Sequence, residues 1–444
     1  MPNRIFMLLL LVFALIGMMF ASPTPAHAQT IRECNVKLNP PLPAATGDVE
    51  FELLLAGNRI VFRADADVTQ PNVESIYSVP IDGSAPAIRL NGPIIPAGGD
   101  VRDNFRVFGN TVIYRTDDLV DNQDRLFSVP VTGGTPILLE DEAVRNFNSD
   151  IRVSNGFVVY STNNGVDEIL FSVPIDGSSN SAAISETILG TTSSRTFDVQ
   201  GSTVVYASTA VSAPDYDIFR VPIDGSGPPV AIDTDPGTNR IVIIRIAGNH
   251  VLYVEQLGFD RFLYTVPLDG SGPRTLLNTD GSNRVSDDFV ITGNRVIYEA
   301  NGTPSNIYSA PIDGIGATVQ LNPTVTAGLG AELPFDGAPV IGNLIAFTAD
   351  TDGTGGFARD ELYAAPIDGS SAATLLSPAL GAPSINGSVR ATTDSFVYQA
   401  DVEGNGREIF SVLAPLERLA GGFPCIYQHS KFLGSGRSLV IPNG

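Results

Sequence analysis

The chain has 444 residues, 43% of them hydrophobic, and carries 48 acidic against 26 basic residues, a net charge of −22. Such a charge repels phosphate backbones and anionic membrane surfaces, which argues against a nucleic-acid-binding protein. Only two histidines, His250 and His429, lie beyond the first 28 residues, and no nucleophile-elbow, zinc-protease, haem or phosphate-loop motif occurs. Catalysis by a histidine base is therefore poorly supported.

The first 28 residues predict a signal peptide. Arg4 precedes an unbroken apolar run at 5–21, and Ala26-His27-Ala28 supplies the small residues that signal peptidase requires. We expect cleavage before Gln29, which makes the mature chain one unit more negative. An uncleaved anchor is the alternative, because the run is close to the minimum for spanning a bilayer. The expected location is the periplasm or the medium, without stable membrane insertion after cleavage.

The two cysteines stand near the two ends of the mature chain, at Cys34 and Cys425. In an exported protein this pattern favours a disulfide between them, which would pin a C-terminal tail at 421–444. Two free thiols are the alternative.

One short stretch, SIYSVPIDGS at 75–84, recurs along the chain. Proline lacks an N–H group, so Pro80 is predicted where a strand ends, and Asp82-Gly83 is predicted to turn the chain. The spacing between the recurring prolines is 44 to 55 residues, and an eighth copy at 408–413 has lost its proline. The proline positions are Pro80, Pro130, Pro174, Pro222, Pro267, Pro311 and Pro366.

A second motif precedes each copy, as in TGNRVIY at 292–298. Its Gly-Asn pair predicts a tight hairpin turn, and its Val-Ile-Tyr run predicts a strand buried on both faces. The sixth period predicts strands at 288–292, 295–299, 306–310 and 317–321. Four short strands in a period of about 47 residues are typical of a propeller blade. We therefore predict an all-β fold, an eight-bladed β-propeller of four-stranded antiparallel blades over residues 29–420.

The predicted ring is closed by an N-terminal strand. Fourth strands end in IRLN at 88–91 and VQLN at 319–322, and the mature chain begins with the similar NVKLN at 35–39. We expect this segment to become the fourth strand of the eighth blade, because closing the ring removes otherwise unpaired edges.

These residues resemble the TolB-like (WD-repeat-like) family of β-propeller repeats and are also similar to the propeller of dipeptidyl peptidases. The family pattern is carried here by 293–298, 307–314 and 319–322, with equivalents in the other blades, and the resemblance spans about 31–415. It implies the fold but no single activity, because such propellers serve as scaffolds, binding modules and enzyme gates. The chain departs from TolB in its eight repeats without a separate N-terminal domain, and from the peptidases in lacking a hydrolase domain.

Charged residues recur at one position of the predicted innermost strand, eight residues before the aromatic of the second motif. Arginines there are candidates for binding an anionic ligand or a carboxylate-bearing chain terminus near the central channel. A structural belt of arginines paired with carboxylates of neighbouring blades is the alternative. The eight positions hold Leu54, Arg106, Arg152, Asp198, Arg245, Val290, Pro339 and Arg390, of which the five charged residues are the candidates.

Aspartates gather in the predicted loops that follow the second strands. Asp350 and Asp352 lie in a run that resembles the start of a calcium loop, so Ca²⁺ is the one cofactor that the sequence suggests. Solvated turn aspartates that accept backbone hydrogen bonds are the alternative. The loop aspartates are Asp65, Asp67, Asp117, Asp118, Asp350, Asp352 and Asp401.

The sequence favours a role without catalysis. We expect an exported monomer that binds a protein or polysaccharide partner through its loop face. A carboxylate-dependent hydrolase or lyase acting on a saccharide or peptide, and a structural envelope component, are the alternatives. Convergent carboxylates in a deep channel pocket would favour the enzyme, whereas a flat loop face with apolar patches would favour binding.

Overall fold

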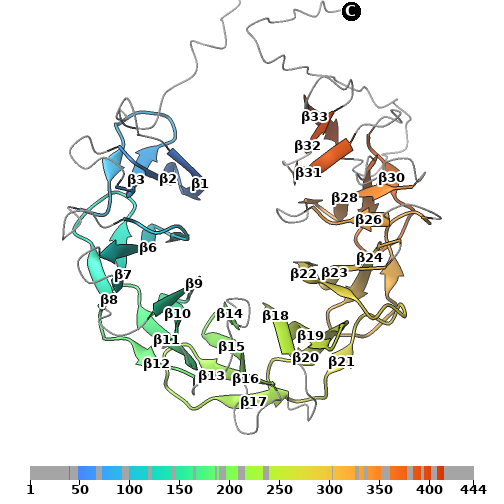
Figure 1. Cartoon of the computed structure of the whole chain (residues 1–444), viewed down its shortest axis with the longest axis horizontal. Coiled ribbons are helices and arrows are strands. Elements are labelled where there is room, and N and C mark those ends of the chain that lie inside the picture. Colours follow the sequence, from blue (N-terminus) through green and yellow to red (C-terminus); the bar gives the residue numbers. More distant parts are fainter. Residues whose placement is uncertain are drawn as a thin grey trace, which may run out of the picture.

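The computed structural model of this chain describes residues 40, 49–66, 73–92, 100–118, 123–141, 146–163, 167–185, 188–189, 197–208, 216–233, 240–302, 304–325, 330–334, 339–351, 361–377, 384–391, 395–401 and 408–414. These residues form strands and no helix, arranged as eight antiparallel sheets that follow one another around a central space (Figure 1). The predicted all-β fold is confirmed. No membrane-spanning helix is found in this part of the chain.

The first four sheets follow the chain order. The first contains β1 (Val49–Ala56), β2 (Arg59–Ala64), β3 (Ser75–Pro80) and β4 (Ile88–Arg89). The second contains β5 (Arg106–Phe108), β6 (Thr111–Asp118), β7 (Gln123–Pro130) and β8 (Ile137–Asp141). The third contains β9 (Asn146–Ser154), β10 (Phe157–Asn163), β11 (Asp167–Pro174), β12 (Ala182–Ala183) and β13 (Ile188–Leu189). The fourth contains β14 (Phe197–Gln200), β15 (Thr203–Ser208), β16 (Asp217–Pro222) and β17 (Val230–Asp233).

The remaining sheets continue in the same way. The fifth contains β18 (Arg240–Ala247), β19 (His250–Leu257), β20 (Asp260–Pro267) and β21 (Thr275–Leu276). The sixth contains β22 (Val285–Thr292), β23 (Arg295–Ala300), β24 (Asn306–Pro311) and β25 (Val319–Gln320). The seventh contains β26 (Gly330–Glu332), β27 (Val340–Ile341), β28 (Leu344–Asp350), β29 (Glu361–Pro366) and β30 (Thr374–Leu375). The eighth contains β31 (Ser384–Ala391), β32 (Ser395–Asp401) and β33 (Glu408–Leu413).

Apart from the third and seventh sheets, each sheet is a meander in which a strand pairs with the next one along the chain. Strands β1, β9, β14, β18, β22 and β31 lie nearest the central space (Figure 1). In the seventh sheet β26 and β27 share the innermost position, and in the third sheet β12 and β13 share the outermost one. Successive four-stranded antiparallel sheets around a centre are the arrangement of propeller blades.

The ring is open between the first and the eighth sheets (Figure 1). The eighth sheet has three strands among the described residues, and it does not pair with the first sheet there. The segment 35–39, which we expect to supply the missing strand, lies outside the described residues. The signal peptide (1–28), both cysteines and the tail at 421–444 also lie outside them. Ring closure and the disulfide therefore stay predictions.

The sixth sheet shows how closely the repeat predicts the strands. Thr292 pairs with Arg295, so Gly293-Asn294 is the predicted two-residue turn, and Gly293 has a positive φ of 58°. β22 begins earlier than expected, because the register shifts between Val285 and Phe289. Such a bulge adds residues to one strand without a change in the local amino-acid pattern.

The recurring SIYSVPIDGS-type stretch is a strand end and a turn, as predicted. Pro311 is the last residue of β24, and the Gly314 N–H donates to its carbonyl at 3.1 Å. Asp313 accepts the N–H of Ile315 at 2.9 Å, which stabilises the turn. The turn also contacts the preceding sheet: a Cβ added to Gly314 would lie 2.6 Å from Cγ2 of Thr275. Gly177 and Gly369 approach the outer strands of their preceding sheets in the same way.

The apolar core lies between adjacent sheets. One cluster joins Leu252 and Leu263 of the fifth sheet to Val296 and Tyr298 of the sixth. In seven sheets the aromatic residue of the second strand stacks on an aromatic of the third, as Tyr298 does on Tyr308 with ring centroids 5.8 Å apart. The second motif is therefore a packing element, since its strand is covered on both faces.

Candidate ligand site at the inner strands

The candidate residues of the innermost strands share one register. Arg152 pairs with Val159, Arg245 with Leu252, and in each case the next residue is the buried tyrosine of the second strand. The same relation holds for Arg106, Asp198 and Arg390. Pro339 belongs to this series as well, because its carbonyl accepts the N–H of Ala346, the residue before Phe347. The spacing in the sequence thus identifies one structural position repeated from sheet to sheet.

Arg152 connects the third sheet to the fourth. Its Nη1 lies 2.5 Å from Oδ1 of Asp150, and its Nε lies 3.9 Å from Oδ1 of Asp198 on β14. The guanidinium carbon also lies 5.8 Å from the ring centre of Phe197, a distance at which a cation is attracted by an aromatic face. Oδ2 of Asp198 accepts the N–H of Ile246 at 2.8 Å, which extends the connection to β18 of the fifth sheet.

Arg106 and Arg245 flank this group from the neighbouring strands. Arg106 on β5 donates to the carbonyl of Phe105 at 3.0 Å, and Arg245 on β18 donates to the carbonyl of Ile244 at 2.9 Å. Both side chains are half-buried, and both act electrostatically on Asp150. The structure therefore brings Arg106, Arg152, Asp198 and Arg245 into one group, which we call the inner-strand cluster together with Asp150.

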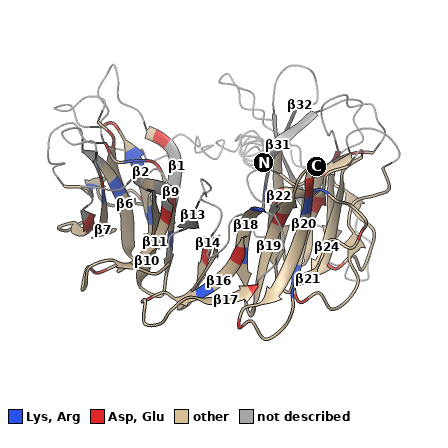
Figure 2. Ribbon diagram, turned by 60° about the horizontal axis from the view of Figure 1, so that its bottom comes forward, with Lys and Arg blue, Asp and Glu red and all other residues tan. Residues whose placement is uncertain are grey.

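Arg390 is the exception among the candidates. It is exposed and lies on β31, across the central space from β9 (Figure 1). The same register position therefore leads to different surroundings in different sheets. Acidic and basic positions are found on sheets at both sides of the ring (Figure 2).

Asp150 is the member of the cluster that our reasoning from the sequence missed. It is only 8% exposed, and burial raises its pKa although Arg152, Arg106 and Arg245 lower it. Two residues on one strand that are two apart lie on the same face, so the spacing from Arg152 was a signal. Asp150 stands where the β9–β10 register shifts, however, and the sequence does not predict that shift.

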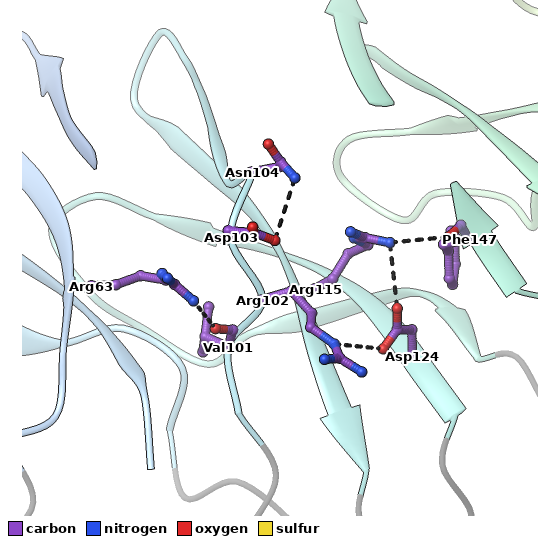
Figure 3. A network of polar contacts seen from close by, with 8 residues as sticks. All are labelled: Arg63, Val101, Arg102, Asp103, Asn104, Arg115, Asp124 and Phe147. Atoms are coloured by element: carbon purple, nitrogen blue, oxygen red, sulfur yellow. Dashed lines mark hydrogen bonds and ion pairs between the residues drawn. The ribbon is translucent and has the colours of Figure 1, made fainter. Parts of the chain in front are cut away.

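A second ionic network joins the first three sheets (Figure 3). Arg115 on β6 is buried and donates to Oδ2 of Asp124 at 3.3 Å and to the carbonyl of Phe147 at 3.5 Å. Arg102 donates to Oδ1 of Asp124 at 3.2 Å, and Arg63 of the first sheet donates to the carbonyl of Val101 at 2.7 Å. Each contact crosses between elements and ends on a protein acceptor, which is typical of a structural network.

The aspartates expected in loops are not all in loops, nor all solvated. Asp117 and Asp118 belong to the end of β6, Asp350 to β28 and Asp401 to β32, because these second strands extend further than predicted. Asp65 is 3% exposed and Asp350 is 1% exposed, so the solvated-turn interpretation is wrong for these two. Within the described ranges, no three His, Cys, Asp or Glu side chains are placed to hold a metal ion. Asp352 lies outside those ranges, and the calcium site stays a prediction. A melting temperature that falls on adding a chelator would support it, and an unchanged one would reject it.

Comparison with known proteins finds no protein-family model and no curated protein that matches this chain. Among solved structures, the chain is similar to a prolyl endopeptidase at 12% identity and a TM-score of 0.45, over 71% of this chain and 48% of that one. It is similar to a puromycin-hydrolysing peptidase of Mycobacterium tuberculosis at 11% identity and a TM-score of 0.43, over 82% of this chain and 60% of that one. It is also similar to the β-propeller domain of the Trilobed protease of Pyrococcus furiosus at 9% identity and a TM-score of 0.41, over 76% and 97%. The chain thus spans about half the length of the first of these peptidases.

Proposed function

We propose that this chain is an exported, TolB-like binding module that takes a protein or glycan partner through its loop face, with one group of the partner reaching the inner strands around the central space. The observation that carries the proposal is the inner-strand cluster, in which three arginines and two aspartates of four adjacent sheets converge. Arginine is suited to such a role, because its planar donors match carboxylates and stay charged at any physiological pH. The partner is expected to bring an anionic group to this cluster.

The test is cross-linking capture from the envelope or medium fraction with the purified mature chain. We expect one partner to be retained by the wild type and by Arg390→Gln, the matched control at the same register position. The double variant Arg106→Gln/Arg245→Gln should lose it, since it removes two positive charges and keeps the Arg152–Asp150 pair. Equal retention by all three would reject the proposal. Release of cleaved saccharide or peptide by the purified chain would favour the hydrolase or lyase instead.

We also propose that the eight sheets form a closed ring of eight blades. The first sheet carries apolar residues that are more exposed than their equivalents in most later sheets. Ile81 is 48% exposed, whereas Val131 and Ile223 are 1% exposed. Leu55 is 69% exposed, whereas Ile246 at the same register position is 8% exposed. A face of this kind is expected where a neighbouring sheet belongs.

We propose that the eighth sheet, completed by residues 35–39, covers this face of the first sheet. Elsewhere the asparagine that ends a fourth strand accepts an N–H of the third strand, as Asn322 does from Ile307 at 2.8 Å and Asn278 from Leu263 at 2.9 Å. By the same pattern, Asn39 would accept the N–H of Ile409 on β33. A disulfide between Cys34 and Cys425 would hold this strand in place, and peptide mapping without reduction tests that pairing.

A further inference from the structure

We propose that Arg106, Arg152 and Arg245 form a binding site for a carboxylate, and that Asp150 occupies this site until the ligand's carboxylate replaces it. The inference rests on the proposed function, because it names the chemical group by which the partner is recognised. A side-chain carboxylate of a peptide and a uronate of a glycan share this chemistry.

The first argument is the charge of the inner-strand cluster. Three arginines lie together with two aspartates in a chain whose net charge is −22. Guanidinium groups gathered at one place in an acidic protein attract an anion there, whereas the acidic surface elsewhere repels it. The cluster is therefore suited to a ligand group that carries a carboxylate.

The second argument is that Asp198 and Asp150 are bound by different kinds of contact. Asp198 receives the main-chain N–H of Ile246 at 2.8 Å besides its contact with Arg152, so it is tied to the scaffold. Asp150 has a contact with Arg152 of its own strand at 2.5 Å and is buried. A contact between two side chains can rearrange without moving the backbone, whereas the bond of Asp198 to a main-chain N–H belongs to the scaffold. Asp150 is therefore the anion that a ligand can replace.

The third argument is the placement of the arginines. Arg152 lies against the face of buried Phe197, which fixes its guanidinium plane. Arg106 and Arg245 are held by main-chain carbonyls on β5 and β18, the inner strands of the second and fifth sheets. Guanidinium groups oriented in this way lose little side-chain entropy when a carboxylate arrives.

The site should respond to pH through Asp150. The charged groups that act on it are Arg152 of its own strand, Arg106 of β5 and Arg245 of β18, while Asp198 of β14 faces it across Arg152. Mild acid protonates Asp150 ahead of an ordinary exposed aspartate, because its pKa is raised. Affinity for a carboxylate that is still ionised should therefore increase as the pH is lowered and Asp150 takes up its proton.

The experiment is calorimetric titration of the mature chain at constant ionic strength with two probes, a blocked tri-glutamate peptide and tri-galacturonate. Blocked tri-glutamine and tri-galactose are the neutral controls. We expect one acidic probe to bind, and its neutral control to bind at least about tenfold more weakly, since a charge-assisted contact is lost. The acidic probe that binds identifies the source of the carboxylate.

The variants separate the site from a general charge effect. Asp150→Asn should bind about tenfold more tightly at pH 7 and lose the pH dependence, because the competing charge is gone. Arg152→Gln should bind at least about tenfold more weakly. Arg106→Gln/Arg245→Gln keeps the Arg152–Asp150 pair and provides the same test if Arg152→Gln does not fold. Arg390→Gln is the control and should equal the wild type.

Three results would overturn the inference. The first is Asp150→Asn binding no more tightly than the wild type, and the second is Arg390→Gln weakening binding as much as Arg106→Gln/Arg245→Gln. The third is absence of binding by both acidic probes. If partner capture still succeeds in that case, the carboxylate assignment is wrong and the binding module stands. If a probe binds but no partner is captured, the carboxylate site stands and the proposed function falls.

Discussion

The surroundings of Glu74 disfavour the charged form of its carboxyl group. Its pKa is raised to about 7, first by burial and then by the nearby carboxylates Glu50, Asp65 and Asp100, against the lowering effect of Arg63. The Glu74 N–H donates to Oδ1 of Asp100 at 2.9 Å, so the backbone holds the Asp100 carboxylate beside Glu74. A group that titrates near neutral pH therefore lies directly before β3 of the first sheet.

We predict that Glu74→Gln stabilises the protein at pH 8 and changes little at pH 5. The folded-state pKa lies above the ordinary value of 4.5, so the stabilising effect of this group is complete below 4.5 and is lost as pH rises through about 7. Because the group is only partly buried, the expected gain at pH 8 is on the order of 1 kcal/mol. Urea unfolding of both proteins at pH 5 and pH 8 measures it. A gain of equal size at both pH values would contradict the assignment.

The buried tyrosines of the second strands connect neighbouring sheets. Tyr298 of the sixth sheet donates its hydroxyl to Oδ1 of Asp280 at 2.9 Å, beyond the outer strand of the fifth sheet. Tyr160 donates in the same way to Oε2 of Glu140 at 2.7 Å, and Tyr253 donates to Asp233. Burial and the accepting carboxylate both raise the pKa of Tyr298, so the hydroxyl stays protonated as the donor.

We predict that Tyr298→Phe lowers the free energy of unfolding by about 1–2 kcal/mol, because a hydrogen bond to a charged acceptor is lost while the ring is kept. Tyr308→Phe is the control, since Tyr308 stacks on the same ring and is less buried, and it should change stability by less than about 0.5 kcal/mol. Chemical unfolding measures both. Equal effects would show that the bond to Asp280 contributes nothing.

At the scale of the element, the sixth sheet has two turns with different roles. Gly293 lies in the turn between β22 and β23, and no atom lies within 4 Å of a Cβ built on it. Gly314 follows β24, and its Cβ would meet Thr275 of the preceding sheet. Both have positive φ, of 58° and 71°, so an alanine is strained at either position. Only Gly314 adds a steric conflict between two sheets.

The expected outcome is that Gly314→Ala destabilises the protein more than Gly293→Ala. Each variant suffers the backbone strain of about 1–2 kcal/mol, and Gly314→Ala adds roughly 1–3 kcal/mol of overpacking. Melting temperatures of the two variants against the wild type provide the comparison. If Gly293→Ala were the less stable protein, the turn would not be a contact between sheets.

At the scale of the whole molecule, the proposed ring closure would join β33 to the exposed face of the first sheet. The eighth sheet has three described strands where most others have four, and Ile81 and Leu55 are exposed at the other side of the opening. A propeller whose ends stay apart leaves two unpaired surfaces in water, whereas a strand from the start of the chain removes both.

We predict that deleting residues 29–39 lowers stability by about 2–4 kcal/mol, because several strand hydrogen bonds are lost, whereas deleting 29–33 has little effect. Both deletions are made in a chain that carries Cys425→Ser, and the shorter one also carries Cys34→Ser. Neither variant can then form the predicted disulfide, so the comparison reports the strand alone. Amide hydrogen exchange of β33 should become faster only in the longer deletion. Unchanged exchange there would show that another segment covers this edge.

The sequence by itself determined the number of repeats, the order of the strands within them and the place of the turns. These features follow from local patterns, since Gly-Asn, Pro-Ile-Asp-Gly and buried aromatic runs act over a few residues. It also identified the register position of Arg152, Asp198 and Arg245, because one period brings equivalent residues to equivalent places.

Only the tertiary structure decided which charges meet. Asp198 contacts Arg152 from the next sheet, and Arg390 at the same register position is exposed on the far side of the ring. Asp150 enters the cluster at a shift of strand register that no local pattern marks. The physical reason is that a repeat encodes each blade separately, whereas burial, desolvation and ion pairing depend on what the neighbouring blade places opposite.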